Sequence, residues 1–201
     1  MSAVSDDFNR ADGSPGSNWQ DMTWGLTITS NVLRYSAATW ATSNMRWADT
    51  VSFLNDQYAQ CNVGCDGGWS AAPLAYNNRA GVLVRGSGNS VATGKWYMNI
   101  VGNSGVANAM IIVKCTAENT YTQLGSDGDA PLNPALINIK AQATILEAGY
   151  DGDAYITTED SSLTSGSPGV GSYWPAGSGN SQPYWDNFLA YDIAYFLPIK
   201  N

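Results

Sequence analysis

Acid–base chemistry in this chain would depend on carboxylates, because the sequence contains no histidine. A Ser–His–Asp triad, a Cys–His dyad and a histidine metal ligand are therefore excluded. Hydrolysis of a glycosidic bond needs two carboxylates that flank the bond. Glu118, Glu147 and Glu159 are too far apart to form such a pair on one strand, and Asp151 and Asp153 bracket a glycine in a predicted hairpin turn. We therefore expect no catalytic residues and no enzymatic activity.

The aromatic side chains are the next candidates, because the chain has 8 Trp and 11 Tyr. Trp69, Tyr173 and Trp174 lie in loop-like sequence. Aromatic rings on loops can stack on sugars or anchor a protein interface, so these three are the candidate glycan or interface contacts. The alternative is that they cover the ends of the folded domain. Other tryptophans fall in predicted strands and are expected in the core, namely Trp24, Trp96 and Trp185.

The three cysteines, Cys61, Cys65 and Cys115, lack the further ligands of a zinc site, which takes four. An odd number of cysteines leaves at least one thiol outside any disulfide. Because free cysteine is one of the residue types most often buried, we expect structural thiols in the core. A Cys61–Cys65 or Cys61–Cys115 disulfide is the alternative.

The charge balance limits the partners. Nine Lys and Arg residues against 17 Asp and Glu residues give a net charge of −8. Such a chain lacks the basic surface that binds phosphate backbones, so we expect no nucleic-acid partner. Only 13% of the residues are charged, against about 25% in a typical domain, which suits a large assembly or contact with sugars. The N-terminal residues do not resemble a signal peptide, and no apolar run approaches the roughly 20 residues of a membrane span.

Alternating apolar and polar residues predict that β-strands position these side chains. Residues 137–145 alternate without a break, which predicts one half-buried strand. Further strands are expected at 26–29, 59–63, 81–85, 96–101, 109–115 and 185–195. Hairpin turns are expected at Ser30-Asn31 and Asp151-Gly152.

Many short strands without a fixed repeat indicate one antiparallel sandwich or barrel that spans residues 1–201. Residues 1–5 are expected to form a flexible arm. Residues 161–182, which are rich in Ser, Gly and Pro, are expected to form a long surface loop.

Four stretches carry a resemblance to a known family: Asp6–Gly13 with Ser17–Trp19, Asn55–Gln60, Asp160–Gly171 and Trp185–Phe188. In that order they resemble the concanavalin A-like (laminin G-like) jelly-roll domains of bacterial and phage surface proteins. The resemblance implies an all-β fold, an antiparallel two-sheet jelly-roll sandwich. This fold hosts many functions, so the resemblance is specific for the fold rather than for the activity.

The resemblance also implies roles for the first and last motifs. In this fold the first and last strands pair in one sheet, which would bring Phe8 and Phe188 together in the core. Asp7, Asp186 and Asn187 would then cap the strand ends. Domains of this kind often carry a structural Ca²⁺, which takes six to eight oxygen ligands, so these three residues are also the candidate metal ligands.

Three functions are compatible with these features. The leading hypothesis is a non-catalytic virion protein of a phage, either a capsid decoration protein or a tail-fibre component, with other virion proteins or surface glycans as partners. The alternative is a carbohydrate-binding or adhesion module at the cell surface or outside the cell. The third is a glycan-active hydrolase or lyase, although the Glu-x-Asp-x-Glu motif of jelly-roll glucanases is missing. Self-association into a homo-oligomer is left open.

Overall fold

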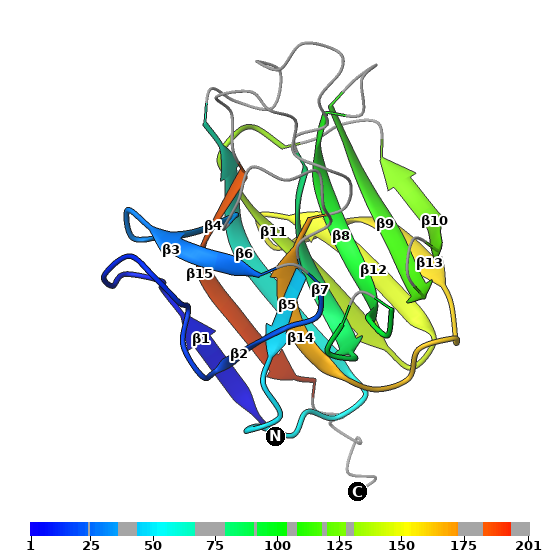
Figure 1. Ribbon diagram of the computed structural model, residues 1–201. Coiled ribbons are helices and arrows are strands. Elements are labelled where there is room, and N and C mark those ends of the chain that lie inside the picture. The colour runs from blue at the N-terminus through cyan, green and yellow to red at the C-terminus, as the bar shows by residue number, and fades with distance from the viewer. Residues whose placement is uncertain are drawn as a thin grey trace, which may run out of the picture.

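The computed structural model describes residues 1–23, 25–35, 44–66, 79–90, 92–103, 108–117, 120–127, 131–172 and 183–193. In these parts of the chain 15 strands form two antiparallel sheets that face each other as a sandwich (Figure 1). Within the same residues, no helix is long and apolar enough to cross a membrane.

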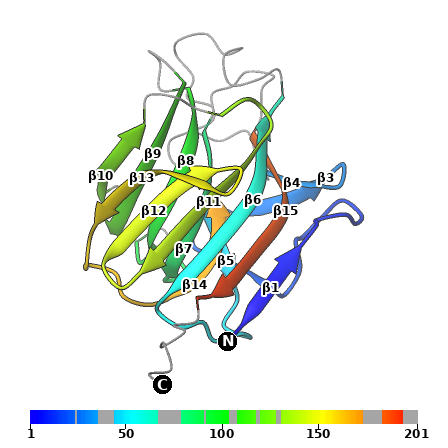
Figure 2. The ribbon, with the colours of Figure 1, turned by 180° about the vertical axis from the view of Figure 1, so that it is seen from behind.

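The eight-stranded sheet has the order β13-β12-β11-β6-β15-β4-β3, with β1 also paired to β15 (Figure 2). Its strands are β1 (Ala3–Asp6), β3 (Leu26–Thr29), β4 (Val32–Tyr35), β6 (Gln57–Cys65), β11 (Ala135–Gln142), β12 (Ile145–Tyr150), β13 (Asp153–Glu159) and β15 (Pro183–Asp192). The seven-stranded sheet has the order β10-β9-β8-β7-β14-β5-β2. Its strands are β2 (Trp19–Asp21), β5 (Asn44–Trp47), β7 (Arg79–Ser87), β8 (Lys95–Asn103), β9 (Asn108–Ala117), β10 (Thr120–Asp127) and β14 (Ser167–Gly171).

The first and last strands pair as the resemblance implies. Strand β1 runs antiparallel to β15, from Ala3 opposite Tyr191 to Asp6 opposite Phe188. Phe8 and Phe188 are both buried in the main core. The expectation of a flexible arm at residues 1–5 is therefore wrong for residues 3–5, because they complete the edge of a sheet through backbone hydrogen bonds.

The predicted strand at residues 137–145 is in fact the end of one strand, a turn and the start of another. Strand β11 ends at Gln142, the chain turns at Ala143 with a φ of 50°, and β12 begins at Ile145. Alternation continues through the turn because Ala143 and Thr144 happen to keep the apolar–polar order. The hairpin predicted at Asp151-Gly152 is confirmed, with positive φ angles at both residues.

The predicted surface loop at residues 161–182 contains a central strand. All five residues of β14 are buried, and the strand lies between β7 and β5. Its Ser-Pro-Gly-Val-Gly sequence is typical of a loop, but the glycines are required by close packing. A Cβ atom at Gly169 would collide with the backbone carbonyl of Met45, and one at Gly171 would collide with the side chain of Asn44. Residues 173–182 lie outside the described residues.

The second and third motifs of the resemblance meet at a buried arginine. Arg85 lies on β7, and its guanidinium donates hydrogen bonds to the carbonyls of Asn55 (2.8 Å), Leu163 (2.9 Å) and Ala143 (2.8 Å). Its backbone N–H donates to the side chain of Gln57. These motifs therefore serve the fold, since they supply the acceptors that a buried guanidinium needs.

All three cysteines are buried and free of disulfides. Burial raises the pKa of each thiol, to about 12 for Cys65 and about 11 for Cys115. A protonated buried thiol is a poor nucleophile, so the structural role expected from the sequence is confirmed over the two disulfides considered.

A polar network ties the end of β13 to the opposite sheet. The carboxylate of Asp160 accepts hydrogen bonds from the Lys114 ammonium (2.5 Å), the Tyr97 hydroxyl (2.5 Å) and the backbone N–H of Ser162 (2.8 Å). Burial alone would raise the pKa of Asp160, but these bonds outweigh burial and hold the pKa well below its ordinary value. Burial and the bond to Asp160 raise the pKa of Tyr97 to about 12.

The close packing of β14 leads to a first prediction. Gly169→Ala should lower the free energy of unfolding by roughly 2–3 kcal/mol, because the added methyl group must displace the β5 backbone. Urea denaturation measures the change. Gly152→Asn is the matched control, since Gly152 has open space and asparagine tolerates its positive φ. A Gly169→Ala protein as stable as the control would contradict the packing described for β14.

The Asp160 network predicts sensitivity to acid and to alkali. A carboxyl whose folded pKa is lowered stabilises the fold above its ordinary pKa of 3.8, and this stability is lost as the pH falls below that value. Tyr97 contributes stability below its ordinary pKa of 10, which is lost as the pH rises toward about 12. Asp160→Asn should therefore be less stable at neutral pH and lose less stability than the wild type on acidification, as followed by thermal unfolding between about pH 2 and pH 7. Equal acid losses in both proteins would contradict the assignment.

Candidate functional site

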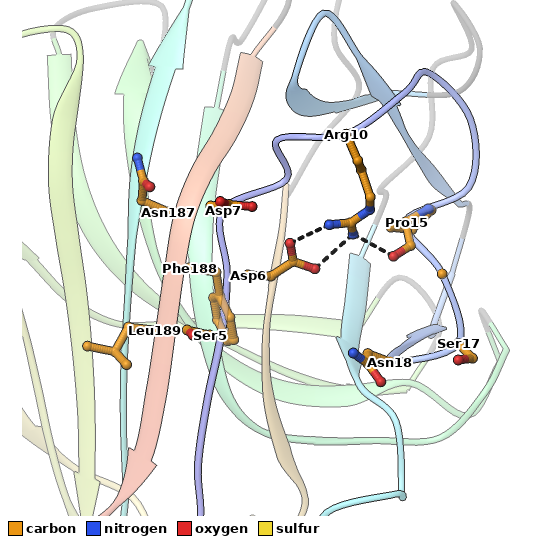
Figure 3. A pocket seen from close by; sticks show the side chains of 11 residues that line it. Ser5, Asp6, Asp7, Arg10, Pro15, Ser17, Asn18, Asn187, Phe188 and Leu189 are labelled. Atoms are coloured by element: carbon orange, nitrogen blue, oxygen red, sulfur yellow. Dashed lines mark hydrogen bonds and ion pairs between the residues drawn. The ribbon is translucent and has the colours of Figure 1, made fainter.

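The carboxylate of Asp6 organises the surface beside the N-terminal strand. It accepts two hydrogen bonds from the Arg10 guanidinium (2.7 and 2.8 Å), one from the indole N–H of Trp19 (2.7 Å) and one from the backbone N–H of Phe8 (2.8 Å). Arg10 also donates to the carbonyl of Pro15 (2.6 Å). Figure 3 shows the Arg10 fork between Asp6 and Pro15. Each group is therefore held in one orientation by the others.

The electrostatics of Asp6 follow from these bonds. Burial would raise the pKa of its carboxyl, but the hydrogen bonds from Arg10, Trp19 and Phe8 outweigh burial and lower the pKa. Arg10 in turn is held charged by Asp6. At neutral pH the pair is a fixed carboxylate and guanidinium, so Asp6 is unsuited to proton transfer.

The local backbone explains why the sequence Asp-Asp-Phe-Asn-Arg folds in this way. Phe8 has a φ of 52°, a conformation that a bulky residue rarely adopts. The bond from its N–H to Asp6 holds this conformation, and the ring is fully buried beside Trp19, at 5.5 Å between ring centroids. The chain therefore turns sharply after β1 and carries Arg10 back over Asp6.

The last motif, Trp-Asp-Asn-Phe, forms a β-bulge. Asp186 pairs with Asn62 and Leu189 pairs with Gln60, so two residues of β15 lie opposite one residue of β6. Asn187, with a φ of 52°, is one of these two. The bulge lies where β15 changes its neighbour from β4 to β1.

Between these motifs lies an open polar depression of about 810 Å³, which we call the N-terminal groove. Charged, amide and hydroxyl groups predominate among the side chains that line it (Figure 3). Its lining residues are Ser5, Asp6, Asp7, Arg10, Pro15, Gly16, Ser17, Asn18, Asn187, Phe188 and Leu189. Asn18 and Asn187 are exposed, so their amides are available to a ligand.

The groove brings together two of the three predicted metal ligands. Asp7 and Asn187 line it, and Asp186 precedes Asn187 in the bulge. Burial and the charge of Asp7 raise the pKa of Asp186. One oxygen of each carboxylate already accepts a backbone N–H, from Asn9 and from Asn187. Across the described residues, no group of three or more Asp, Glu or Cys side chains could hold a metal ion. The donors fall short of the six to eight oxygens that Ca²⁺ prefers, so calcium here stays a prediction.

Three further residues were predicted from the sequence as site residues. Trp69, Tyr173 and Trp174 lie outside the described residues, so their role as glycan or interface contacts stays a prediction. Sequence reasoning selected Asp7 and missed its neighbour Asp6. The available signal was the spacing, with a hydrophobic residue two positions after Asp6 and an arginine four positions after it.

Two of the carboxylates weighed for catalysis lie on the paired strands β12 and β13, with Glu147 opposite Thr157 and Glu159 opposite Ile145. Glu147 is ion-paired to Lys140 at 2.7 Å, and Glu159 is exposed on the edge strand β13. Asp151 and Asp153 flank the hairpin turn, as expected. Glu118 lies outside the described residues.

Part of the seven-stranded sheet carries a separate cluster of buried apolar side chains. This cluster includes Leu83, Trp96 and Met98, none of which is exposed to solvent. The side-chain amide of Asn44 and the indole N–H of Trp96 are buried and have no hydrogen-bond partner among the residues that the structure describes. The N-terminal groove, in contrast, is open to a ligand.

Comparison with known proteins identifies the fold. No protein-family profile matches the chain, and no curated protein matches it in sequence. Among solved structures, carbohydrate binding module CBM66 from Bacillus subtilis is similar, with a TM-score of 0.64 and 13% identity over 89% of this chain and 98% of that chain. A legume lectin-like domain from Entamoeba histolytica has a TM-score of 0.54 and 14% identity over 92% and 97%.

A prokaryotic β-1,3-1,4-glucanase (lichenase) derived from a mouse hindgut metagenome is also similar. Its TM-score is 0.57, with 12% identity over 96% of this chain and 99% of that chain. The fold is therefore a concanavalin A-like jelly-roll sandwich, as the sequence motifs indicated. Because the same fold carries binding modules and a glucanase, the fold alone does not determine the activity.

The contrast between Asp6 and Asp7 leads to a prediction. Asp6→Asn should lower the free energy of unfolding by about 2–3 kcal/mol, because it removes the charge that binds Arg10 and Trp19. Asp7→Asn, in an exposed neighbour with one backbone bond, should change stability by less than about 0.5 kcal/mol. Urea denaturation of the two variants measures the difference. Equal effects would show that Asp6 does not hold this region together.

Proposed function

We propose that this protein is a carbohydrate-binding module that uses the N-terminal groove to hold its glycan. The groove's fixed polar lining carries this proposal. The likeness to a carbohydrate binding module and a lectin-like domain supports it.

The chemistry of the groove suits sugar hydroxyls. A sugar presents pairs of neighbouring hydroxyls, which can donate and accept hydrogen bonds at once, and planar amide, guanidinium and carboxylate groups match such pairs. Arg10 is already oriented by Asp6 and Pro15, so little conformational entropy is lost when a ligand binds. Leu189, which is half-buried, adds apolar surface for the C–H groups of the sugar ring.

Binding without cleavage fits the described groove better than hydrolysis does. A glycosidase needs an acid and a second carboxylate. The lowered pKa of Asp6 makes it a poor acid, and the hydrogen bonds that occupy both of its oxygens make it a poor nucleophile or base. Because a glucanase has a similar fold, an assay for hydrolysis products must accompany the binding experiments.

The virion location stays a prediction, because none of the similar proteins described above is a virion protein by name. A glycan-binding role is compatible with it, since a virion surface protein can hold a cell-surface glycan. It is equally compatible with a protein at the cell surface or outside the cell, the alternative location weighed from the sequence.

Two exposed amides provide the test of the groove. Asn18→Ala and Asn187→Gly should each weaken glycan binding by about tenfold, the loss expected for one hydrogen bond of about 1.4 kcal/mol. Glycine is chosen at Asn187 because it retains the positive φ of the bulge. A glycan array with neutral and acidic oligosaccharides identifies the ligand, and isothermal titration calorimetry measures the affinity.

Gln123→Ala is the matched control, an exposed amide on β10 at the far edge of the other sheet. It should leave the affinity unchanged. Failure of the wild type to bind any glycan, with and without Ca²⁺, would reject the function. Binding that is insensitive to both groove variants would reject the groove as its site. Release of reducing sugar from a bound glycan would replace the binding module with an enzyme.

A further inference from the structure

A second surface feature stands apart from the groove, on the β12–β13 hairpin. The rings of Tyr150 and Tyr155 stack in parallel, with centroids 4.3 Å apart and an interplanar angle of 10°. Tyr150 packs against the main core, whereas Tyr155 is 45% exposed. The outer ring is therefore held on a supported inner ring.

The backbone sets this stack. Ala148 pairs with Ile156 and Gly149 pairs with Ala154, so Tyr155 is the extra residue of a β-bulge. A bulge redirects a side chain out of the normal alternation. The bulge also requires glycine at position 149, because a Cβ there would collide with the carbonyl of Asp153. Tyr155 is thus aimed by the strand and not by a flexible loop.

Two carboxylates lie at the turn next to the stacked rings, and Asp153 pairs with Tyr150 across the hairpin. Asp151 and Asp153 are exposed at the hairpin turn, and both act electrostatically on Tyr155. A side-chain hydrogen bond with Tyr150 is the largest cause that raises the pKa of the Tyr155 hydroxyl, followed by desolvation and by electrostatic effects of Tyr150, Asp153 and Asp151. The hydroxyl therefore stays a neutral donor and acceptor beside two acceptors.

We propose that Tyr155, with Asp151 and Asp153, forms a second carbohydrate-contact site that takes a neutral sugar. The apolar face of a pyranose stacks on the exposed ring, and its hydroxyls donate to the two carboxylates. This inference rests on the proposed carbohydrate-binding function and adds a site and a ligand class to it. We call the stacked pair with its two carboxylates the tyrosine platform.

The local surroundings favour a sugar over a protein partner. The residues between the two tyrosines are Asp151, Gly152, Asp153 and Ala154, which are small or charged. A stable protein interface needs about 800 Å² from each partner with an apolar centre, whereas one sugar ring is about the size of one aromatic ring. The two negative charges disfavour acidic glycans, so the ligand class is a neutral one.

The two proposed sites are separated along the eight-stranded sheet. Strands β11, β6 and β15 lie between β12 and β1, which Figure 2 shows in one view. Four steps of about 4.8 Å give a separation near 19 Å across the strands. A ligand at one site does not occupy the other, so the two can be tested separately.

Affinity electrophoresis tests the platform with defined polysaccharides: neutral β-glucan, mannan and fructan, and acidic polygalacturonate. One of the neutral polymers should retard the wild type. Tyr155→Ala should lower the affinity for that polymer by about fivefold or more, because the stacking surface is lost. Tyr155→Phe keeps the ring and should stay within about twofold of the wild type. Polygalacturonate should not retard the wild type.

Tyr191→Ala is the matched control. Tyr191 is 37% exposed and stacks on Tyr58 at 4.9 Å, on the outer face of the same sheet but away from the hairpin. It should bind as the wild type does, and circular dichroism confirms that all variants are folded. Retardation by every neutral polymer that is the same in Tyr155→Ala as in the wild type, or retardation by the acidic polymer that Tyr155→Ala abolishes, overturns the platform. Retardation by none of the polymers overturns the carbohydrate-binding function as well. Sensitivity to Tyr155 with no effect of the groove variants upholds the platform and rejects only the groove.

Discussion

The buried carboxylate of Asp6 is the constraint on which this side of the protein depends. It lies at the end of β1 in the eight-stranded sheet, and it binds the indole of Trp19 in the seven-stranded sheet. Trp19 then contacts Phe188 and Trp47 at ring centroid distances of 5.0 and 5.3 Å. One carboxylate therefore joins both sheets, orders the aromatic core between them and orients the arginine of the groove.

Much of the fold follows from the sequence, because two-residue periodicity and motif order are local signals. Residues 57–65 alternate as a half-buried strand should, and the Asp151-Gly152 turn forms as its residue types require. The prediction of secondary structure failed where tertiary contacts determine the conformation. Ser167–Gly171 has the composition of a loop and becomes a central strand, since only glycine fits against β5. The turn at Ala143 was not predicted, because apolar and polar residues continue to alternate through it as they would in one strand.

The candidate site was less predictable than the fold. Asp6 and Asp7 are adjacent and identical in type, so the residue type cannot show that Asp6 accepts the hydrogen bonds of this region while Asp7 is exposed. Only the positive φ of Phe8, a property of the folded chain, directs the backbone so that Arg10 returns to Asp6. The redirection of Tyr155 likewise depends on a bulge, which alternation does not reveal.

The ion pairs also affect which charges the acidic chain presents at its surface. Within the described parts of the chain, ion pairs are formed by Arg10, Arg34, Arg46, Arg85, Lys114 and Lys140, and the whole chain has a net charge of −8. The remaining charge is therefore mostly negative, and much of the surface is neutral and polar. Such a surface repels acidic polymers at long range and leaves hydrogen bonding and stacking as the means of holding a ligand.

The pairing of β1 with β15 has a mechanical consequence. The two strands run antiparallel, and their outer ends are joined by bonds between Ser2 and Asp192. A force that pulls these ends apart acts on the ladder one rung at a time, so the strands would separate like a zipper and not slide past each other. The peeling would begin at Ala3 and reach Asp6 last, where four hydrogen bonds converge. Under tension, the hydrogen bonds of Asp6 would keep the groove assembled after the first residue pairs of the two strands have separated.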